Sequence, residues 1–184
     1  RGNSEQVRRN IFSAAYNYEL PFGTGKRFAN VRGVAGQLVG GWQVGGITYL
    51  RTGTPYSVPF NATLAGWLGG RADALRDPRL SRSERSEYRW FDPSAFGVPA
   101  PFTWGNGTRN MLFGPGDIIF DVSALKDFSI MERAKMQFRA EFFNMPNHAN
   151  FGNPSTNISV PATVGRIFSA GAPREIQFAL KLLF

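Results

Sequence analysis

Few side chains in this sequence are spaced for catalysis or metal binding. His148 is the only histidine and the chain has no cysteine, which excludes disulfides, thiolate metal sites and cysteine nucleophiles. A catalytic triad or a histidine-based metal site needs partners within reach, but "NHANFGN" around His148 holds asparagines and no carboxylate. A loop histidine with local hydrogen bonds is the favoured interpretation. The acidic loop residues Asp73, Asp77 and Asp92 offer a weaker alternative, the coordination of a cation.

The sequence "GTGKR" at residues 23–27 has the composition of a phosphate-binding loop but not its spacing. Such a loop needs a second glycine followed directly by Lys and then Ser or Thr, between a strand and a helix. Here Arg27 follows Lys26, Pro21 precedes the segment, and we expect no helix after it. A glycine turn is the simpler interpretation. Since no nucleophile–base pair or metal cluster is visible, we expect no enzymatic activity, no cofactor and no metal.

The elements that position these side chains are predicted to be long β-strands. The chain contains 21 glycines, 12 prolines and 17 phenylalanines, a composition that disfavours helices and favours strands. Five segments alternate apolar and polar residues with a period of two, which places one set on each face of a strand. "AKMQFRAEFFN" at residues 134–144 is the clearest of them. We expect strands near 8–20, 41–52, 117–128, 132–145 and 174–184, antiparallel and paired in sequence order.

This alternation predicts one apolar and one polar face for the sheet. The apolar residues predicted to point outward are Phe12, Tyr16, Phe120, Val122, Met136, Phe138, Phe142, Phe178, Leu180 and Leu182. The polar residues predicted to point toward a lumen include Arg139, Glu141, Gln177 and Lys181. The charged residues of neighbouring strands, Asp121 and Asp127 on one and Lys135, Arg139 and Glu141 on the next, are expected to pair across the sheet.

The lengths of the strands and of their connections favour a membrane barrel. About ten residues per strand exceeds the five or six typical of soluble sheets and suits a tilted crossing of a bilayer. A short turn is expected around "SIMER", residues 129–133, whereas residues 53–116 form a long loop. The two longest connections share one end of the sheet, as extracellular loops do in outer-membrane barrels. We therefore predict an all-β fold, an antiparallel up-and-down meander within a large transmembrane β-barrel, with residues 53–116 on the cell exterior.

The formal net charge of +8 raises the question of nucleic-acid binding. The basic residues are scattered along the chain, and no recognition helix or aromatic RNA-binding motif organises them. Arginine also suits the phosphate groups of lipid headgroups. The densest charged stretch, "RDPRLSRSERSEYR" at residues 76–89, is typical of a solvated loop. We therefore expect contact with lipid and no nucleic-acid partner.

Several aromatic residues fall within the long loop. Trp90, Phe91, Phe96 and Trp104 are candidates for contact with a ligand, and packing of the loop on itself is the favoured alternative.

An ordered set of motifs resembles a known family. The segments are "GGWQVGGITYLRTGTPY", "RWFDPSAFGVPAP", "RNMLFGPG", "DVSALKDFSIMERAKMQFRAEFFNMPNHANFGNP" and "REIQFALKLLF". Together they resemble the C-terminal part of Oar-like TonB-dependent receptors of the bacterial outer membrane. The resemblance covers nearly the whole chain, from about Arg9 to Phe184.

The resemblance implies more than the residues themselves do. It implies a barrel of about twenty-two strands with a plugged lumen, and uptake of a substrate energised by TonB through an N-terminal part outside these residues. Residues 1–184 would be the C-terminal part of that barrel domain, because five strands are too few to close a barrel. The implied partners are outer-membrane lipid and lipopolysaccharide, the barrel-assembly machinery and TonB.

The final strand, "EIQFALKLLF", carries a further prediction. Phe178, Leu180, Leu182 and Phe184 share one apolar face. An apolar strand with a free edge can be captured by addition to another sheet. A terminal aromatic on such a strand resembles the signal that the barrel-assembly machinery reads, so we expect these four residues to act in assembly.

Two other architectures would show the same alternation. One is a soluble β-sandwich that serves as a binding module. The other is an oligomeric β-barrel pore to which each subunit contributes a few strands.

Overall fold

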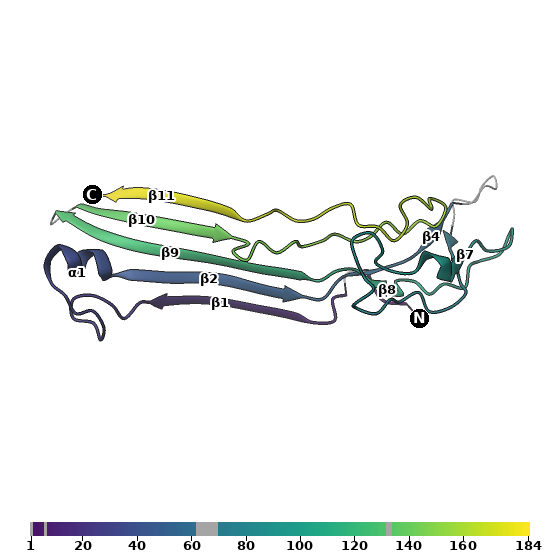
Figure 1. Ribbon diagram of the computed structural model, residues 1–184, viewed down its shortest axis with the longest axis horizontal. Helices are drawn as coiled ribbons and strands as arrows, with labels where there is room; N and C mark the ends of the chain where they lie inside the picture. The colour runs from purple at the N-terminus through teal and green to yellow at the C-terminus, as the bar shows by residue number, and fades with distance from the viewer. Residues whose placement is uncertain (1, 6, 62–69, 132–133) are drawn as a thin grey trace. The chain divides into compact units, whose positions relative to one another are not determined.

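Five long strands form a single sheet in the computed structural model, which describes residues 2–5, 7–61, 70–131 and 134–184. The strands lie side by side in the order in which they occur along the chain (Figure 1). They are β1 (Ile11–Glu19), β2 (Trp42–Arg51), β9 (Asp117–Met131), β10 (Ala134–Phe143) and β11 (Glu175–Leu183). The predicted all-β fold and the five predicted strands are confirmed.

Neighbouring strands are antiparallel, as the alternation and the connections predicted. Met136 of β10 faces Phe128 of β9 on one side and Leu182 of β11 on the other. At one end of the β1–β2 pair, the N–H of Leu20 donates to the carbonyl of Trp42 at 2.8 Å. At the other end, the N–H of Thr52 donates to the carbonyl of Asn10 at 3.0 Å. From Lys135 onward, even-numbered residues of β10 therefore lie beside even-numbered residues of β9 and β11, and odd-numbered beside odd-numbered, which keeps one face of the sheet distinct from the other.

Strand β9 runs further than predicted. The sequence "SIMER" was expected to be a turn, but β9 continues to Met131, so Ser129 and Ile130 belong to the strand. The register shifts by one residue between Ala134 and Lys135 of β10 because β9 carries an additional residue at this point. The part of the expected turn at residues 132–133 lies outside the described residues.

A helix forms where none was expected. The connection between β1 and β2 contains α1 (Gly33–Val39), a helix of seven residues. The expectation that no helix follows "GTGKR" is therefore wrong, although α1 begins well beyond Lys26 and Arg27. The segment 23–27 is a glycine turn, in which the N–H of Lys26 donates to the carbonyl of Gly23 at 3.0 Å. No helix in the described part of the chain has the length and apolar character needed to span a membrane.

The two ends of this connection meet at a pair of glycines. A Cβ atom on Gly23 would lie 2.3 Å from the Cα atom of Gly40, and Gly23 has a φ of +107°. Both the close approach and the left-handed backbone require glycine at this position. The contact closes residues 24–39 into a small folded segment.

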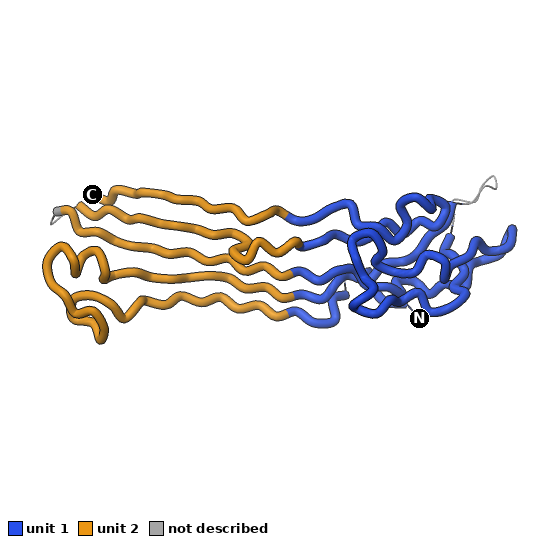
Figure 2. Tube along the Cα trace, in the orientation of Figure 1, with its two compact units in different colours: residues 1–11, 51–117, 150–171 blue, residues 12–50, 118–149, 172–184 orange. Residues whose placement is uncertain are grey.

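The chain divides into two compact units (Figure 2). One unit contains residues 12–50, 118–149 and 172–184, and so holds most of the five-stranded sheet. The other contains residues 1–11, 51–117 and 150–171, which include most of the long loop. This loop-based unit has short strand pairs, namely β3 (Pro55–Tyr56) with β8 (Leu112–Phe113), β4 (Pro59–Phe60) with β5 (Gly70–Arg71), and β6 (Asp73–Ala74) with β7 (Phe96–Gly97).

The loop-based unit has a hydrophobic core of its own. Its buried residues are Tyr56, Val58, Ala72, Phe91, Phe96, Leu112 and Val164. The buried Asn110 is hydrogen-bonded as well. Its Oδ1 accepts from the hydroxyl of Ser57, its backbone N–H donates to that hydroxyl, and its Nδ2 donates to the carbonyl of Asn3. The carboxylate of Asp117 forms ion pairs with Arg8 at 2.9 Å and Arg51 at 3.1 Å. The described part of the long loop is therefore a folded structure and not an extended connection.

Candidate functional site

The two faces of the sheet differ sharply in chemistry. Successive residues of a strand point to opposite faces, and the register pairs even-numbered residues with even-numbered ones across β9, β10 and β11. All ten residues predicted to point outward are even-numbered, and the eight of them on β9, β10 and β11 share the apolar face. All four predicted to point toward a lumen are odd-numbered and share the polar face.

The polar face carries an ion pair and an amide–carboxylate bond. Arg139 and Glu141, neighbours on this face of β10, lie 3.5 Å apart. Gln137 donates from Nε2 to Oδ1 of Asp127 across the β9–β10 pair at 2.9 Å. These groups are solvent-accessible and bonded to one another, so the face suits contact with water or a polar solute.

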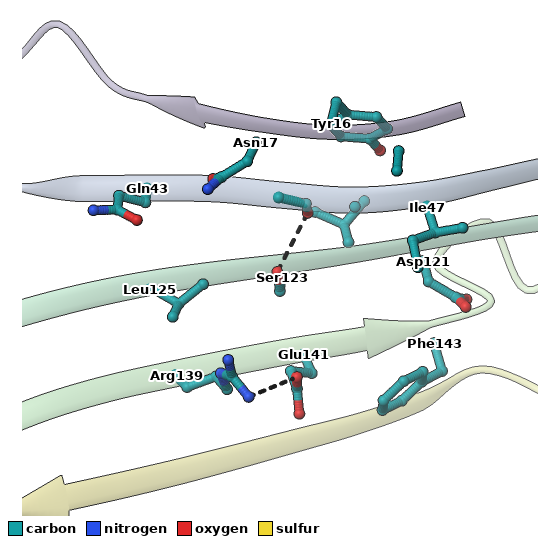
Figure 3. Close-up of a pocket in the computed structure, with 14 residues that line it drawn as sticks. Tyr16, Asn17, Gln43, Ile47, Asp121, Ser123, Leu125, Arg139, Glu141 and Phe143 are labelled. Carbon is teal, nitrogen blue, oxygen red and sulfur yellow. Dashed lines mark hydrogen bonds and ion pairs between the residues drawn. The ribbon is translucent and has the colours of Figure 1, made fainter.

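The polar face also has a hollow of about 460 Å³. Its lining comes from four strands, and Figure 3 shows Gln43, Ser123, Arg139 and Glu141 around it. The hydroxyl of Ser123 donates to the carbonyl of Gly45 at 3.4 Å. The absence of a side chain at Gly45 contributes to the depression, since a Cβ there would lie 3.3 Å from that hydroxyl. Hydrogen-bond donors and acceptors thus line this open space together with the apolar side chains of Ile47, Leu125 and Phe143.

The expected pairing of charges across the sheet is wrong. The register places Arg139 opposite Leu125 and Glu141 opposite Ser123, so the charged residues of β10 do not face those of β9. Arg139 therefore pairs along its own strand, with Glu141. Asp121 instead accepts from the backbone N–H of Asn144 at 2.8 Å.

The apolar face is largely exposed in this chain. Trp42, Phe138 and Phe178 form a row of rings across it, with centroids 6.2 Å apart for the first pair and 6.1 Å for the second. The side chains of Phe178 and Leu180 are 66% and 69% exposed. A continuous apolar surface of this kind requires a nonpolar covering, which a lipid bilayer provides.

Among the described strand residues, Lys126 is the one charged residue on the apolar face, and the sequence analysis did not predict this position. Lys126 faces Phe138 across the β9–β10 pair, and only 3% of it is exposed. Its Nζ donates to the carbonyl of Gly40, directly after α1, and lies 5.1 Å from the centre of the Phe128 ring. The alternation of β9 could have predicted this position, because Lys126 is even-numbered like most of the apolar residues of that strand.

The loop aromatics divide into buried and exposed residues. Phe91 and Phe96 are core residues of the loop-based unit, with ring centroids 5.9 Å apart, as self-packing requires. Trp90 packs against that core and donates from Nε1 to the carbonyl of Phe113 at 2.9 Å. Trp104 is 76% exposed and is the most exposed of the four.

The acidic loop residues bind protein groups. Asp92 accepts from Ser94 and pairs with Arg76 and Arg89, and these bonds lower the pKa of its carboxyl from 3.8 to about 2. Asp77 pairs with Arg79, and Asp73 accepts from the N–H of Asn106. Within the described ranges, no group of three or more acidic, histidine or cysteine residues is placed to hold a metal ion.

His148 takes part in a local turn, as the sequence suggested. Its N–H donates to Oδ1 of Asn144 at 3.0 Å, and Nδ2 of Asn144 donates back to the carbonyl of His148 at 2.9 Å. The same amide reaches the carbonyl of Ala172 at 3.1 Å, which ties the start of the β10–β11 connection to its end.

Comparison with protein families supports the interpretation of the two faces. A family model described as "Outer membrane beta barrel domain" matches residues 1–177. Comparisons with curated proteins and with solved structures gave no match.

Proposed function

We propose a function that starts from one fact: the chain belongs to the outer membrane β-barrel domain family. It is therefore part of a β-barrel in the bacterial outer membrane, with its apolar face toward lipid and its polar face toward the barrel interior. The proposal is that this barrel is a TonB-dependent receptor that takes up a substrate, and that these residues are a C-terminal part of its wall.

The observation that carries the proposal is the folded long loop. Residues 52–116 leave the sheet after β2 and return at β9, and together with residues 150–171 they form a unit with its own core. A simple pore needs no such structure outside its wall, whereas a receptor uses long, ordered extracellular loops to contact its ligand. The exposed Trp104 is the candidate contact on this loop.

The motif set supports the finer assignment. The segments from Gly40 to Tyr56 and from Asp121 to Pro154 resemble Oar-like receptors, and both belong largely to the five-stranded sheet and its turns. In this proposal the partners are outer-membrane lipid and lipopolysaccharide at the apolar face, the barrel-assembly machinery during insertion, and TonB through an N-terminal part of the receptor. The chain itself performs no catalysis and contacts no nucleic acid.

Two measurements on the full-length protein test the receptor assignment. The purified periplasmic domain of TonB should bind the full-length protein in detergent, and removal of the N-terminal part should abolish binding. In planar bilayers the protein should show little steady conductance, because a plug fills the lumen. Stable open-channel conductance without TonB binding would instead identify an open pore.

A further inference from the structure

We propose that the β1–β2 connection, residues 21–41, is a membrane-interface anchor that binds anionic phospholipid headgroups. The proposal rests on the barrel assignment above, because it requires the apolar face of the sheet to meet lipid. It adds a binding site for lipid at one rim of the barrel. We call the segment 21–41 the rim anchor.

The rim anchor is attached from the lipid side of the sheet. Trp42, which belongs to the apolar face, donates from Nε1 to the carbonyl of Leu38 at 3.0 Å. Lys126, also on that face, donates to the carbonyl of Gly40. These two side chains hold the C-terminal end of α1, and a cation is favourable at that end of a helix. The attachment places the end of α1 beside the surface that lipid covers.

The rim anchor exposes apolar side chains that its own fold does not cover. Val34 and Leu38 of α1 are 75% and 58% exposed. The other large apolar residues of the segment are also exposed, namely Phe22, Phe28, Val31 and Val39. Phe22 and Phe28 pack on each other with ring centroids 6.0 Å apart. Apolar side chains at the end of a membrane barrel are stabilised when they enter the boundary between headgroups and acyl chains.

The charge of the rim anchor selects the lipid. It contains Lys26, Arg27 and Arg32 and no acidic residue. Glu19, just before it, pairs with Lys26 at 2.9 Å, which leaves the charge of the two arginines uncompensated by this carboxylate. Arginine near a bilayer surface is attracted to anionic headgroups and forms paired hydrogen bonds with phosphate. The combination of exposed apolar residues and clustered cations indicates an anionic lipid surface and not a zwitterionic one.

The test places an environment-sensitive fluorophore on the rim anchor of the full-length protein. This chain has no cysteine, so Val34→Cys adds one thiol to it for labelling with NBD. The labelled protein is placed in nanodiscs of phosphatidylcholine alone or mixed equally with phosphatidylglycerol, with nitroxide-labelled lipid as quencher. A second protein carries the label at Leu180→Cys, on the apolar face of β11.

Both labels should be quenched by lipid, and quenching at position 34 should increase with phosphatidylglycerol. Arg27→Gln with Arg32→Gln should remove most of that increase, and high salt should do the same. The matched control, Arg79→Gln with Arg82→Gln, removes the same charge from the loop-based unit and should leave the increase unchanged.

Three results would overturn the proposal, and they are distinguishable. Quenching at position 180 but not at 34 would refute the rim anchor and leave the barrel intact. If quenching at position 34 changes neither with phosphatidylglycerol nor with the substitution of Arg27 and Arg32, recognition of anionic headgroups is refuted. Absence of quenching at 180 would refute the lipid-facing sheet itself, and the rim anchor with it.

Discussion

Phe138 of β10 and Phe178 of β11 stack across the strand pair, with ring centroids 6.1 Å apart and planes 18° apart. They are diagonal neighbours, since Phe138 lies opposite Leu180 and Phe178 lies opposite Ala140. The small residue at 140 leaves room for the stacked rings on the apolar face. A diagonal aromatic pair of this kind fixes the register of the two strands.

The first prediction compares the two faces of β11. Leu180→Arg should destabilise the full-length barrel by about 2–4 kcal/mol if it lies near the bilayer centre, because that side chain meets lipid. Lys181→Arg, on the polar face, should change the free energy of unfolding by less than about 0.5 kcal/mol. Denaturant unfolding in lipid vesicles measures both values. Equal effects at the two positions would contradict the assignment of the faces.

The second prediction concerns assembly. Phe178, Leu180, Leu182 and Phe184 present an apolar row, and 97% of Phe184 is exposed. If the assembly machinery captures β11 through this row, Phe184→Asp should slow insertion of the full-length protein several-fold and leave the assembled barrel nearly as stable. Pulse-chase assays of insertion in cells measure the rate. Glu175→Gln, on the polar face at the other end of β11, serves as the control, and insertion of Phe184→Asp at the normal rate would argue against the signal.

The third prediction concerns orientation. Long connections lie outside the cell in barrels of this family, so trypsin added to intact cells should cut between Arg79 and Arg89. Arg27 and Arg32, in the connection at the opposite end of β2, should be cut only after the outer membrane is opened. Mass spectrometry of the fragments identifies the cleaved sites. The reverse pattern would invert the topology.

The fourth prediction concerns Lys126. A hydrogen bond from a charged group contributes about 1.5–3 kcal/mol, so Lys126→Met should increase local opening of residues 21–41 by roughly tenfold or more. Trypsin cleavage at Arg27 and Arg32 of the detergent-solubilised protein should accelerate accordingly. Lys135→Met, on the polar face of β10, is the matched control. An unchanged cleavage rate would show that the bond to Gly40 does not hold the connection.

The fifth prediction concerns pH and Asp92. Hydrogen bonds from Ser94 and the ion pairs with Arg76 and Arg89 lower the pKa of this carboxyl from 3.8 to about 2 in the folded chain. Because the folded pKa is the lower one, the carboxylate stabilises the loop-based unit above about pH 4, and this contribution is lost as the pH falls toward 2.

Pepsin digestion across this pH range tests the dependence. Cleavage near Asp92 should rise as the pH falls in the natural protein, whereas Asp92→Asn should be cut more readily at pH 4 and show a weaker pH dependence. Asp77→Asn, which alters an exposed ion pair, should behave like the natural protein. A pH profile unaltered by Asp92→Asn would show that this carboxylate does not stabilise the unit.

The strands were predictable because one physical rule governs them. Phe138, Ala140 and Phe142 alternate with Arg139 and Glu141, and only a strand places these two sets on opposite faces. Their register was not predictable, because the additional residue in β9 shifts the pairing by one position near Lys135. The expected charge pairs failed because the observed register places Ser129, Leu125 and Ser123 opposite Lys135, Arg139 and Glu141.

Helix α1 was not predictable from its own residues. It contains Gly33 and Gly36, which disfavour helices, and its N-cap residue Arg32 makes no capping bond with its side chain. The helix is stabilised from outside, by Trp42 and by Lys126, which is distant in the sequence. For the candidate site, the sequence identified the polar residues, but their arrangement around a hollow depends on four strands coming together.

The contact between Gly23 and Gly40 has an evolutionary consequence. Because the backbone closes on itself at these two residues, the chain between them can change in length or composition without moving β1 or β2. Changes between these two glycines would thus alter the rim anchor and its contact with lipid while the sheet keeps its geometry. We expect natural insertions and deletions to concentrate there, with glycine retained at both ends.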